Sequence, residues 1–387
     1  MKTLIKNVNV VTASEVIFNS AVLVEDGKIC SIGTVDASAK KVVDGKGGYL
    51  IPGFIDMHCH GGIELDFIDA TAEEMQKIAS FHLSHGTTTM LATTLTASEK
   101  TTENCLKTFA EYKKDNPDGT LLGVHMEGPW FSPAQCGAQD VSNMKTPSKA
   151  EIERIKQAYP FVLRVSCAPE LDGGMEFGKR AKELGVIASV GHTDADFDTV
   201  CLAHENGYEL MTHFYSSMKG TERVNLYRVA GAVEAGYYLD DMNVEIIADG
   251  RHLPDSLLKL IYKIKGVDKI SLITDATRGC GLENGTEAFI GPKEDAMPIV
   301  IENDVALLKD KSSFAGSTAT FDRLYKVMAN VIGKDFVSLS KMASLNPARL
   351  LGLKDRGEIK VGKRADLIIV NDSLEIQNIF HKGEEVK

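Results

Sequence analysis

Six short apolar segments, each followed by a polar side chain and then by small or turn residues, constrain the fold of this chain more than any other feature. The polar ends of these segments are, in chain order, His58 with His60, Glu127, His192, His213, His252 and Asp275. This is the pattern of strands that deliver polar groups to loops. Helix-length intervals separate most of the segments, and strand–helix alternation continues from residue 50 to about residue 350. The chain therefore predicts a (β/α)8 TIM-type barrel, an α/β fold whose strands present these groups at one rim.

Amphipathic stretches between the strands predict the helices of this barrel. The segment Thr71-Ala72-Glu73-Glu74 has the form of a helix start, and its helix is expected to run to about residue 85. Further helices are expected over 98–114, 148–158, 174–184, 197–205, 254–262 and 320–331. The β-rich stretches 87–94 and 162–168 predict two more strands.

The two ends of the chain differ from its alternating middle. The N-terminal stretch contains short alternating runs and an Asp26-Gly27 hairpin signal, and β character returns at 364–370. We therefore expect residues 1–50 and 354–387 to form one small β domain beside a barrel of residues 51–353. A chain of 387 residues is long enough for one large domain with such an accessory.

Composition excludes several classes of function. With 43 Lys and Arg against 54 Asp and Glu the net charge is −11, so we expect no binding to nucleic acid or to an anionic membrane. No apolar stretch reaches the roughly 20 residues of a membrane helix, and the first residues lack a secretory core. Seven dispersed cysteines without a CxxC pair indicate reduced thiols. We therefore expect a cytoplasmic location.

His58 and His60 are separated by one residue, so a strand would point both imidazoles to the same side. Imidazole is the commonest protein ligand for divalent transition metals. Such a pair also occurs by chance on surface strands. It becomes informative here because Glu127, His192 and His213 follow at later strand ends. Three nitrogen or oxygen ligands that leave one position open are typical of a catalytic zinc site.

Eight segments carry a resemblance to a known family. They are PGFIDMHCHGG (52–62), HMEGPWFSP (125–133), VGHTDA (190–195), THFYSSM (212–218), IADGRH (247–252), TDA (274–276), FAGS (314–317) and GEIKVGKRADL (357–367). Through them, essentially the whole chain resembles the amidohydrolase superfamily and, within it, the N-acetylglucosamine-6-phosphate deacetylase family. HMEGP is the segment most specific to that branch, whereas GxIxxGxxADL is shared across the superfamily and marks the small β domain.

The resemblance implies a divalent metal centre. Glu127, His192 and His213 would be its primary ligands. His58 and His60 would hold a second ion, since some deacetylases of this family keep the pair and others have lost it. One or two ions per subunit are therefore expected. Zinc is the expected metal and ferrous iron the alternative, because imidazole and carboxylate suit both.

Asp275 and His252 would carry the chemistry that the ion assists. Metal coordination activates water for attack on an acyl carbonyl, and Asp275 would take the proton of this water and pass it to the leaving amine. His252 would polarise the carbonyl and stabilise the oxyanion. The alternative roles are a helix cap for Asp275 and a surface position for His252. The expected reaction converts N-acetylglucosamine 6-phosphate to glucosamine 6-phosphate and acetate, in amino-sugar catabolism.

The residues expected to bind the phosphorylated amino sugar depart from the family pattern at two places. Family members commonly have an Asn-Ala pair where this chain has Ser216-Ser217, and many read Gly-Ala-His where it has Gly137-Ala138-Gln139. Hydroxyls and a glutamine amide can still bind phosphate or a sugar hydroxyl. The expected substrate-binding residues are Ala138, Gln139, Ser216, Ser217, Arg223, Arg228, His252, Phe314, Ala315 and Gly316.

The phosphate-binding arginine of the family has no direct counterpart in this chain. Alignment on residues 230–232 puts Asn225 at its place, with Arg223 and Arg228 nearby. Each arginine could instead be an ordinary solvated charge. In family members this arginine can come from the neighbouring subunit, which implies a homodimer.

Three alternatives remain open from the sequence. The substrate could be N-acetylgalactosamine 6-phosphate, the enzyme could be another amidohydrolase acting on a different C–N amide, or the barrel could be non-catalytic. Related barrels bridge two metals through a carboxylated lysine after the fourth strand, and residues 165–170 contain no lysine. A non-catalytic barrel predicts lost ligands, yet Glu127, His192, His213 and Asp275 are all present.

Overall fold

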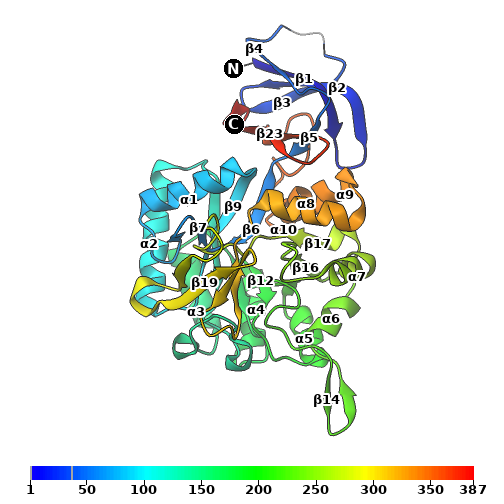
Figure 1. Ribbon diagram of the computed structural model, residues 1–387. Helices are drawn as coiled ribbons and strands as arrows, with labels where there is room; N and C mark the ends of the chain where they lie inside the picture. Colours follow the sequence, from blue (N-terminus) through cyan, green and yellow to red (C-terminus); the bar gives the residue numbers. More distant parts are fainter. Residues whose placement is uncertain (1, 36–37) are drawn as a thin grey trace.

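A computed structural model describes residues 2–35 and 38–387 of the chain. A small β domain packs on one end of a larger strand-and-helix body, and the two chain ends lie together in the small domain (Figure 1). Within the described residues, no helix is both long enough and apolar enough to cross a lipid bilayer. All seven cysteines are free thiols.

The larger body is built around eight parallel strands. In chain order they are β6 (Phe54–Cys59), β9 (Thr87–Thr94), β10 (Leu121–Glu127), β11 (Val162–Cys167), β12 (Ile187–Val190), β13 (Tyr208–Met211), β16 (Asn243–Ile246) and β17 (Ile270–Leu272). Each strand pairs in parallel with the next. A bridge between Cys59 and Ala276 joins the last strand region to the first. The predicted (β/α)8 barrel is therefore confirmed.

One helix follows each barrel strand. The helices are α1 (Ala72–Ser84), α2 (Glu99–Asp115), α3 (Lys149–Ala158), α4 (Gly174–Glu183), α5 (Phe197–Glu205), α6 (Ala232–Tyr238), α7 (Asp255–Lys265) and α8 (Phe321–Ile332). Thr71 and Glu74 form the capping box expected at the start of α1. Seven of these helices match the predicted ranges within a few residues. Helix α6 was missed because it has only seven residues and contains Gly236.

Two groups of apolar side chains stabilise the barrel. The larger cluster joins outward-facing strand residues such as Val124 and Val244 to helix residues such as Ile78 and Phe109. A separate cluster contains Leu91, Leu210 and other strand residues but none from α1–α8, so it fills the inside of the barrel. Two short helices, α9 (Phe336–Ser340) and α10 (Asn346–Leu350), follow α8 and precede the C-terminal strands.

The small domain is a mixed sheet made by both ends of the chain. Its strands are β1 (Lys2–Val11), β2 (Val16–Glu25), β3 (Lys28–Gly33), β4 (Lys41–Asp44), β5 (Tyr49–Pro52), β22 (Leu367–Val370), β23 (Ile376–His381) and β24 (Glu384–Glu385). Antiparallel pairing of β5 with β22 joins the N-terminal strands to the C-terminal ones, as expected from the β character at both ends. Residue Gly53 separates β5 from the first barrel strand.

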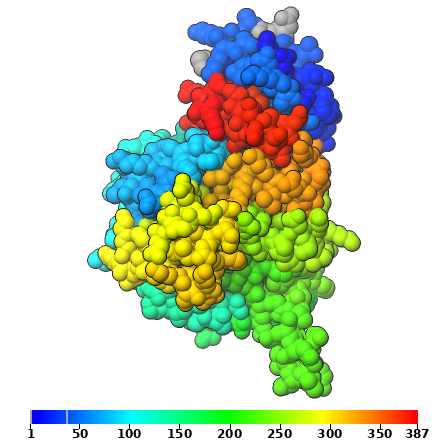
Figure 2. All heavy atoms as spheres, in the orientation of Figure 1, coloured from blue at the N-terminus to red at the C-terminus, as the bar shows by residue number. Residues whose placement is uncertain are grey.

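Three sheets outside the barrel were not predicted. One is a small pairing of β7 (Gly61–Gly62) with β8 (Leu65–Asp66). The second is an antiparallel hairpin of β14 (Glu222–Val224) and β15 (Tyr227–Val229), which projects from the body (Figures 1 and 2). The third is an antiparallel sheet of β18 (Glu287–Ile290), β19 (Met297–Glu302), β20 (Val305–Leu308) and β21 (Phe314–Ser317), inserted between β17 and α8. It forms a raised yellow layer on the face seen in Figure 2.

Candidate metal centre and active site

The polar side chains of the six predicted strand ends converge on one pocket. It is lined by His60, Leu95, Glu127, Gly137, Ala138, Gln139, His192, His213, Ser216, Ser217, His252, Asp275, Thr277, Ile290, Ser313, Phe314 and Gly316. These residues come from the carboxyl ends of barrel strands, the loops after them and the inserted sheet. That end of a (β/α)8 barrel is where catalytic groups are found.

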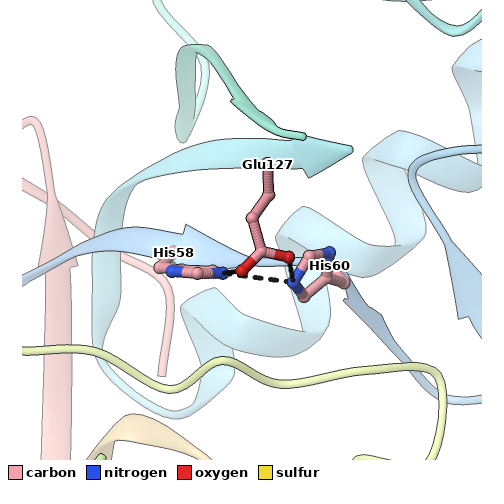
Figure 3. Close-up of side chains that lie close together, drawn as sticks. All are labelled: His58, His60 and Glu127. Atoms are coloured by element: carbon pink, nitrogen blue, oxygen red, sulfur yellow. Dashed lines mark hydrogen bonds and ion pairs between the residues drawn. The ribbon is translucent and has the colours of Figure 1, made fainter. Parts of the chain in front are cut away.

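His58 and His60 face Glu127 across the top of the barrel (Figure 3). The two Nε2 atoms lie 3.2 Å apart. Nε2 of His58 is 3.3 Å from Glu127 Oε1, and Nε2 of His60 is 3.4 Å from Glu127 Oε2. All three side chains are almost fully buried. The predicted presentation of both imidazoles to one point is confirmed.

Glu127 also faces a second pair of histidines. Its Oε1 lies 3.0 Å from His213 Nε2 and 3.4 Å from His192 Nε2. Nδ1 of His192 is 2.9 Å from the carbonyl oxygen of Gln135, and Nδ1 of His213 is 3.2 Å from that of Ser216. A carbonyl can only accept, so both Nδ1 atoms carry protons, and the Nε2 atoms, which face Glu127, are the nitrogens that would bind a metal ion.

These residues fit a divalent metal centre. His58, His60 and Glu127 form one group and Glu127, His192 and His213 form another, with the ligand atoms of each group within 4.8 Å of one another. Imidazole nitrogen and carboxylate oxygen are suitable donors for a catalytic divalent ion. Because the two groups share Glu127, the arrangement indicates a binuclear site.

Three residues that deliver side chains to this centre have left-handed backbone conformations. The φ angles of His192, His213 and Asp275 are +47°, +28° and +48°. Each residue lies two or three positions beyond the end of its strand. Such angles are costly for residues other than glycine and concentrate at functional sites. They turn the chain sharply at the rim of the barrel.

Glycine is required at two positions beside the centre. Gly128 directly follows Glu127 and has a φ of +83°, and a Cβ there would lie 2.4 Å from Oγ1 of Thr96. Gly137 has a φ of +59°, and its Cβ would lie 2.9 Å from Oγ of Ser217. Side chains at these positions would displace the loops that surround the ligands.

Asp275 completes the centre from the eighth strand. Its Oδ1 is 3.2 Å from His58 Nε2 and 3.1 Å from His60 Nε2. Burial opposes ionisation, but the charge of His58 and the hydrogen bond from His60 outweigh it and lower the pKa of Asp275. The carboxylate form, which can accept a proton, is therefore favoured.

The surrounding charges also set the ionisation of Glu127 and His58. Burial opposes the charge on Glu127, but His58 and the bonds from His192 and His213 hold its pKa well below the usual range. Burial likewise opposes a charge on His58, but Glu127 and Asp275 raise its pKa to about 10. A proton on His58 would compete with a metal ion, so we expect metal binding to release protons.

A polar layer lies beneath the centre, inside the barrel. Arg164 and Glu245 are fully buried there and form a two-point ion pair, with Arg164 Nη2 donating to Glu245 Oε2 at 2.7 Å. Glu245 Oε2 is 3.6 Å from Nδ1 of His58. The ring of His125 lies edge-on to His58, with centroids 4.6 Å apart, and its Nε2 is 2.8 Å from Oγ of Ser166. His125 thus packs against a candidate ligand.

His252 lines the pocket and is oriented by Asp249. Nδ1 of His252 is 2.8 Å from Asp249 Oδ2, and Asp249 Oδ1 accepts from the main-chain N–H groups of residues 251 and 252. The ring lies 4.7 Å from that of Phe314. Because Asp249 holds Nδ1, Nε2 of His252 is left for the pocket.

Most of the predicted substrate-binding residues line the pocket. Ala138, Gln139, Ser216, Ser217, His252, Phe314 and Gly316 do so. Ala315 is fully buried and is not part of the lining. Arg223 and Arg228 face each other across the projecting hairpin, where both are exposed, and neither lines the pocket of its own chain.

Sequence reasoning missed several residues that support or line the site. Asp249 lies three residues before His252, and this spacing could have indicated its role. Arg164 and Glu245 are charged residues in apolar strands, which is a weaker signal. Thr277 and Ile290 reach the pocket from the loop after β17 and from the inserted sheet, and we find no sequence signal for them.

The model of the amidohydrolase family matches residues 49–386 of the chain. The chain is 33% identical over 383 residues to an N-acetylglucosamine-6-phosphate deacetylase of Bacillus subtilis, covering 96% of this chain and 94% of that protein. It is 29% identical over 364 residues to an N-acetylgalactosamine-6-phosphate deacetylase of Escherichia coli O157:H7, covering 93% of each.

A solved structure shares the whole fold. It is a mutant N-acetyl-D-glucosamine-6-phosphate deacetylase of Mycobacterium smegmatis in complex with N-acetyl-D-glucosamine-6-phosphate. The TM-score is 0.90 at 30% sequence identity, over 100% of this chain and 99% of that one.

Proposed function

The chain belongs to the amidohydrolase family and, within it, to the N-acetylglucosamine-6-phosphate deacetylase family, and from this we propose that it hydrolyses N-acetylglucosamine 6-phosphate to glucosamine 6-phosphate and acetate. The observation that carries the proposal is the convergence of Asp275 with two histidine pairs around Glu127 in one buried pocket. A cytoplasmic setting is part of the proposal, supported by the free thiols.

The proposed cofactor is zinc, with ferrous iron as the alternative, and two ions per subunit. Glu127 would be shared between the ions, with His58 and His60 on one side and His192 and His213 on the other. When bound, divalent ions at these ligands lower the pKa of water and polarise an amide carbonyl. The buried Nε2 atoms and the carboxylate are the donors that such ions prefer.

Asp275 would move the proton in this reaction. As a carboxylate beside the ligand cluster, it accepts the proton of the attacking water at one of its oxygens. It then donates this proton to the amine nitrogen as the bond to the acetyl carbon breaks. His252, held by Asp249, would donate from Nε2 to the acyl oxygen when both ring nitrogens are protonated, and would stabilise charge that develops there.

The phosphate would be bound partly by a second copy of the chain. Among the described residues that line the pocket, none is Lys or Arg, although a phosphate dianion normally requires a cation. The hydroxyls of Ser216 and Ser217 supply neutral donors. An exposed hairpin that carries Arg223 and Arg228 supports a homodimer in which one subunit's arginine reaches its partner's site.

A substrate panel tests this function. It compares the 6-phosphates of N-acetylglucosamine and N-acetylgalactosamine, both unphosphorylated sugars and dihydroorotate, with acetate and free amine as readouts. We expect the glucosamine derivative to give the highest kcat/KM. A preference for the galactosamine derivative, which the relative in E. coli O157:H7 makes the second candidate, would correct the epimer. Activity that persists after complete metal removal would contradict the mechanism.

A further inference from the structure

Gln139 contacts the carboxylate that both metal groups share. Its Nε2 lies 2.6 Å from Glu127 Oε2, and its Oε1 accepts a hydrogen bond of 2.8 Å from the main-chain N–H of Thr96. A main-chain N–H can only donate, so the oxygen of the amide must face Thr96. The nitrogen therefore faces Glu127 and donates to it, which settles the orientation of this amide on chemical grounds.

Because of where Gln139 lies, its hydrogen bond to Glu127 restricts the orientation of the Glu127 carboxylate. Gln139 is only 7% exposed and lies in the loop after β10, whereas Thr96 lies in the loop after β9. Two hydrogen bonds thus hold a long side chain in one conformation between two barrel loops. Once both are made, the amide has one N–H left for any other partner.

The bond falls on a particular oxygen of the carboxylate. Oε2, which accepts from Gln139, is the oxygen nearest His60 at 3.4 Å. Oε1 is the oxygen nearest His58, His192 and His213. If the carboxylate rotated, Oε2 would no longer face His60 and Oε1 would no longer face the other three histidines.

We propose that Gln139 is a positioning residue for the metal centre, which fixes the carboxylate of Glu127 and thereby strengthens metal binding. The inference rests on the metal site of the proposed function. Hydrogen bonds to metal-ligating groups typically contribute a factor of about 10–100 in metal affinity. Gln139 therefore acts through Glu127, and it does so whether or not it also contacts the substrate.

Zinc affinity of the Gln139→Leu variant tests this inference. Leucine keeps the approximate volume of the side chain and removes both hydrogen bonds. Metal-free wild type and variant are titrated with Zn²⁺ in competition with a chromophoric chelator. We expect zinc binding of the variant to be weaker by about 10–100-fold. Affinity within twofold of wild type at every site would overturn the inference.

Asn143→Leu is the matched control. Asn143 lies on the same loop, and its amide also donates to a carboxylate, that of Asp140 at 2.7 Å, away from the candidate ligands. We expect this variant to bind zinc like wild type, and an equal loss of affinity would assign the effect to the loop rather than to Glu127. If Gln139→Leu does not fold, Gln139→Asn, which is one methylene shorter, serves in its place.

Failure of the proposed metal centre can be distinguished from failure of the role proposed for Gln139. If wild type binds no divalent ion, the proposed metal centre fails. If wild type binds zinc and Gln139→Leu binds it equally well, the metal centre stands and only the role of Gln139 is wrong.

Discussion

At the scale of single residues, Asp275 combines two properties that proton transfer requires. It lies within 3.2 Å of two candidate ligands, and its environment favours the carboxylate. We predict that Asp275→Asn lowers kcat by about 10²–10⁴-fold, the typical contribution of a positioned acid–base group. Zinc content, measured on the same preparation, should stay within about twofold of wild type. Near-normal turnover would remove Asp275 from this role.

Asp249 offers a second test at this scale. It holds Nδ1 of His252 at 2.8 Å, and although burial opposes its ionisation, the bonds and charge of His252 lower its pKa. Asp249→Asn replaces the carboxylate by a neutral amide and should disturb the orientation and protonation of His252. We predict a decrease of about 10²–10³-fold in kcat, as for a lost oxyanion donor, with zinc affinity unchanged. A change confined to KM would indicate a role in binding alone.

The same scale shows why part of the site was not predictable. The order His58, His60, Glu127, His192, His213 and Asp275 could be read from the sequence, because each residue follows an apolar run. The left-handed backbones at three of these positions could not, because their cost is offset by contacts with residues far away in the chain.

At the scale of elements, the β14–β15 hairpin exposes large apolar side chains that a second subunit could cover. Leu226 and Tyr227 at its tip are 82% and 78% exposed. If the hairpin reaches a second subunit, the double variant Arg223→Ala and Arg228→Ala should raise KM for the phosphorylated sugar about 10-fold or more, as expected for a lost charged contact to phosphate. Hydrolysis of the unphosphorylated sugar should not change.

Subunit mixing decides where this arginine acts. The double variant is mixed with Asp275→Asn protein under conditions of subunit exchange, and KM is measured again. Recovery of a low KM in the mixture indicates that the arginine is donated between subunits. If the KM of the mixture stays high and both variants are monomeric, the active site is not shared between two subunits.

Most of the barrel helices could be predicted from the sequence, whereas the β14–β15 hairpin and the inserted sheet could not. Helix α1 was readable because Thr71 and Glu74 form a local capping box. The hairpin and the inserted sheet of β18–β21 were missed because their strands have only three to six residues. Such short runs give weak periodicity, and their place over the barrel depends on contacts that are remote in sequence.

At the scale of the whole molecule, acid should destabilise the fold partly through the small β domain. His381 lies in β23, and burial lowers its pKa to about 4, despite the opposing charge of Asp366. The native state therefore binds no proton at His381 between about pH 6.5 and pH 4, whereas the unfolded chain does. Stability falls as the pH falls through this range.

Comparison with His381→Gln isolates this effect. Between pH 7.5 and pH 5 we predict that wild type loses about 2 kcal/mol more unfolding free energy than the variant. The measurement is urea unfolding of both metal-free proteins at the two pH values. Equal losses in the two proteins would show that His381 titrates normally in the folded state.

By itself, the sequence determined that strands and helices alternate and that both ends of the chain contribute strands to one small domain. It also determined which polar residue lies at the end of each of the six strands that lead to the site. These features are readable because periodicity, capping and strand-end chemistry are properties of neighbouring residues. Only the tertiary structure decided that Glu127 lies between two histidine pairs, that Gln139 donates to it, and that Arg223 and Arg228 stand away from their own pocket. The physical reason is that side-chain direction and loop path follow from packing between segments that are far apart in the chain.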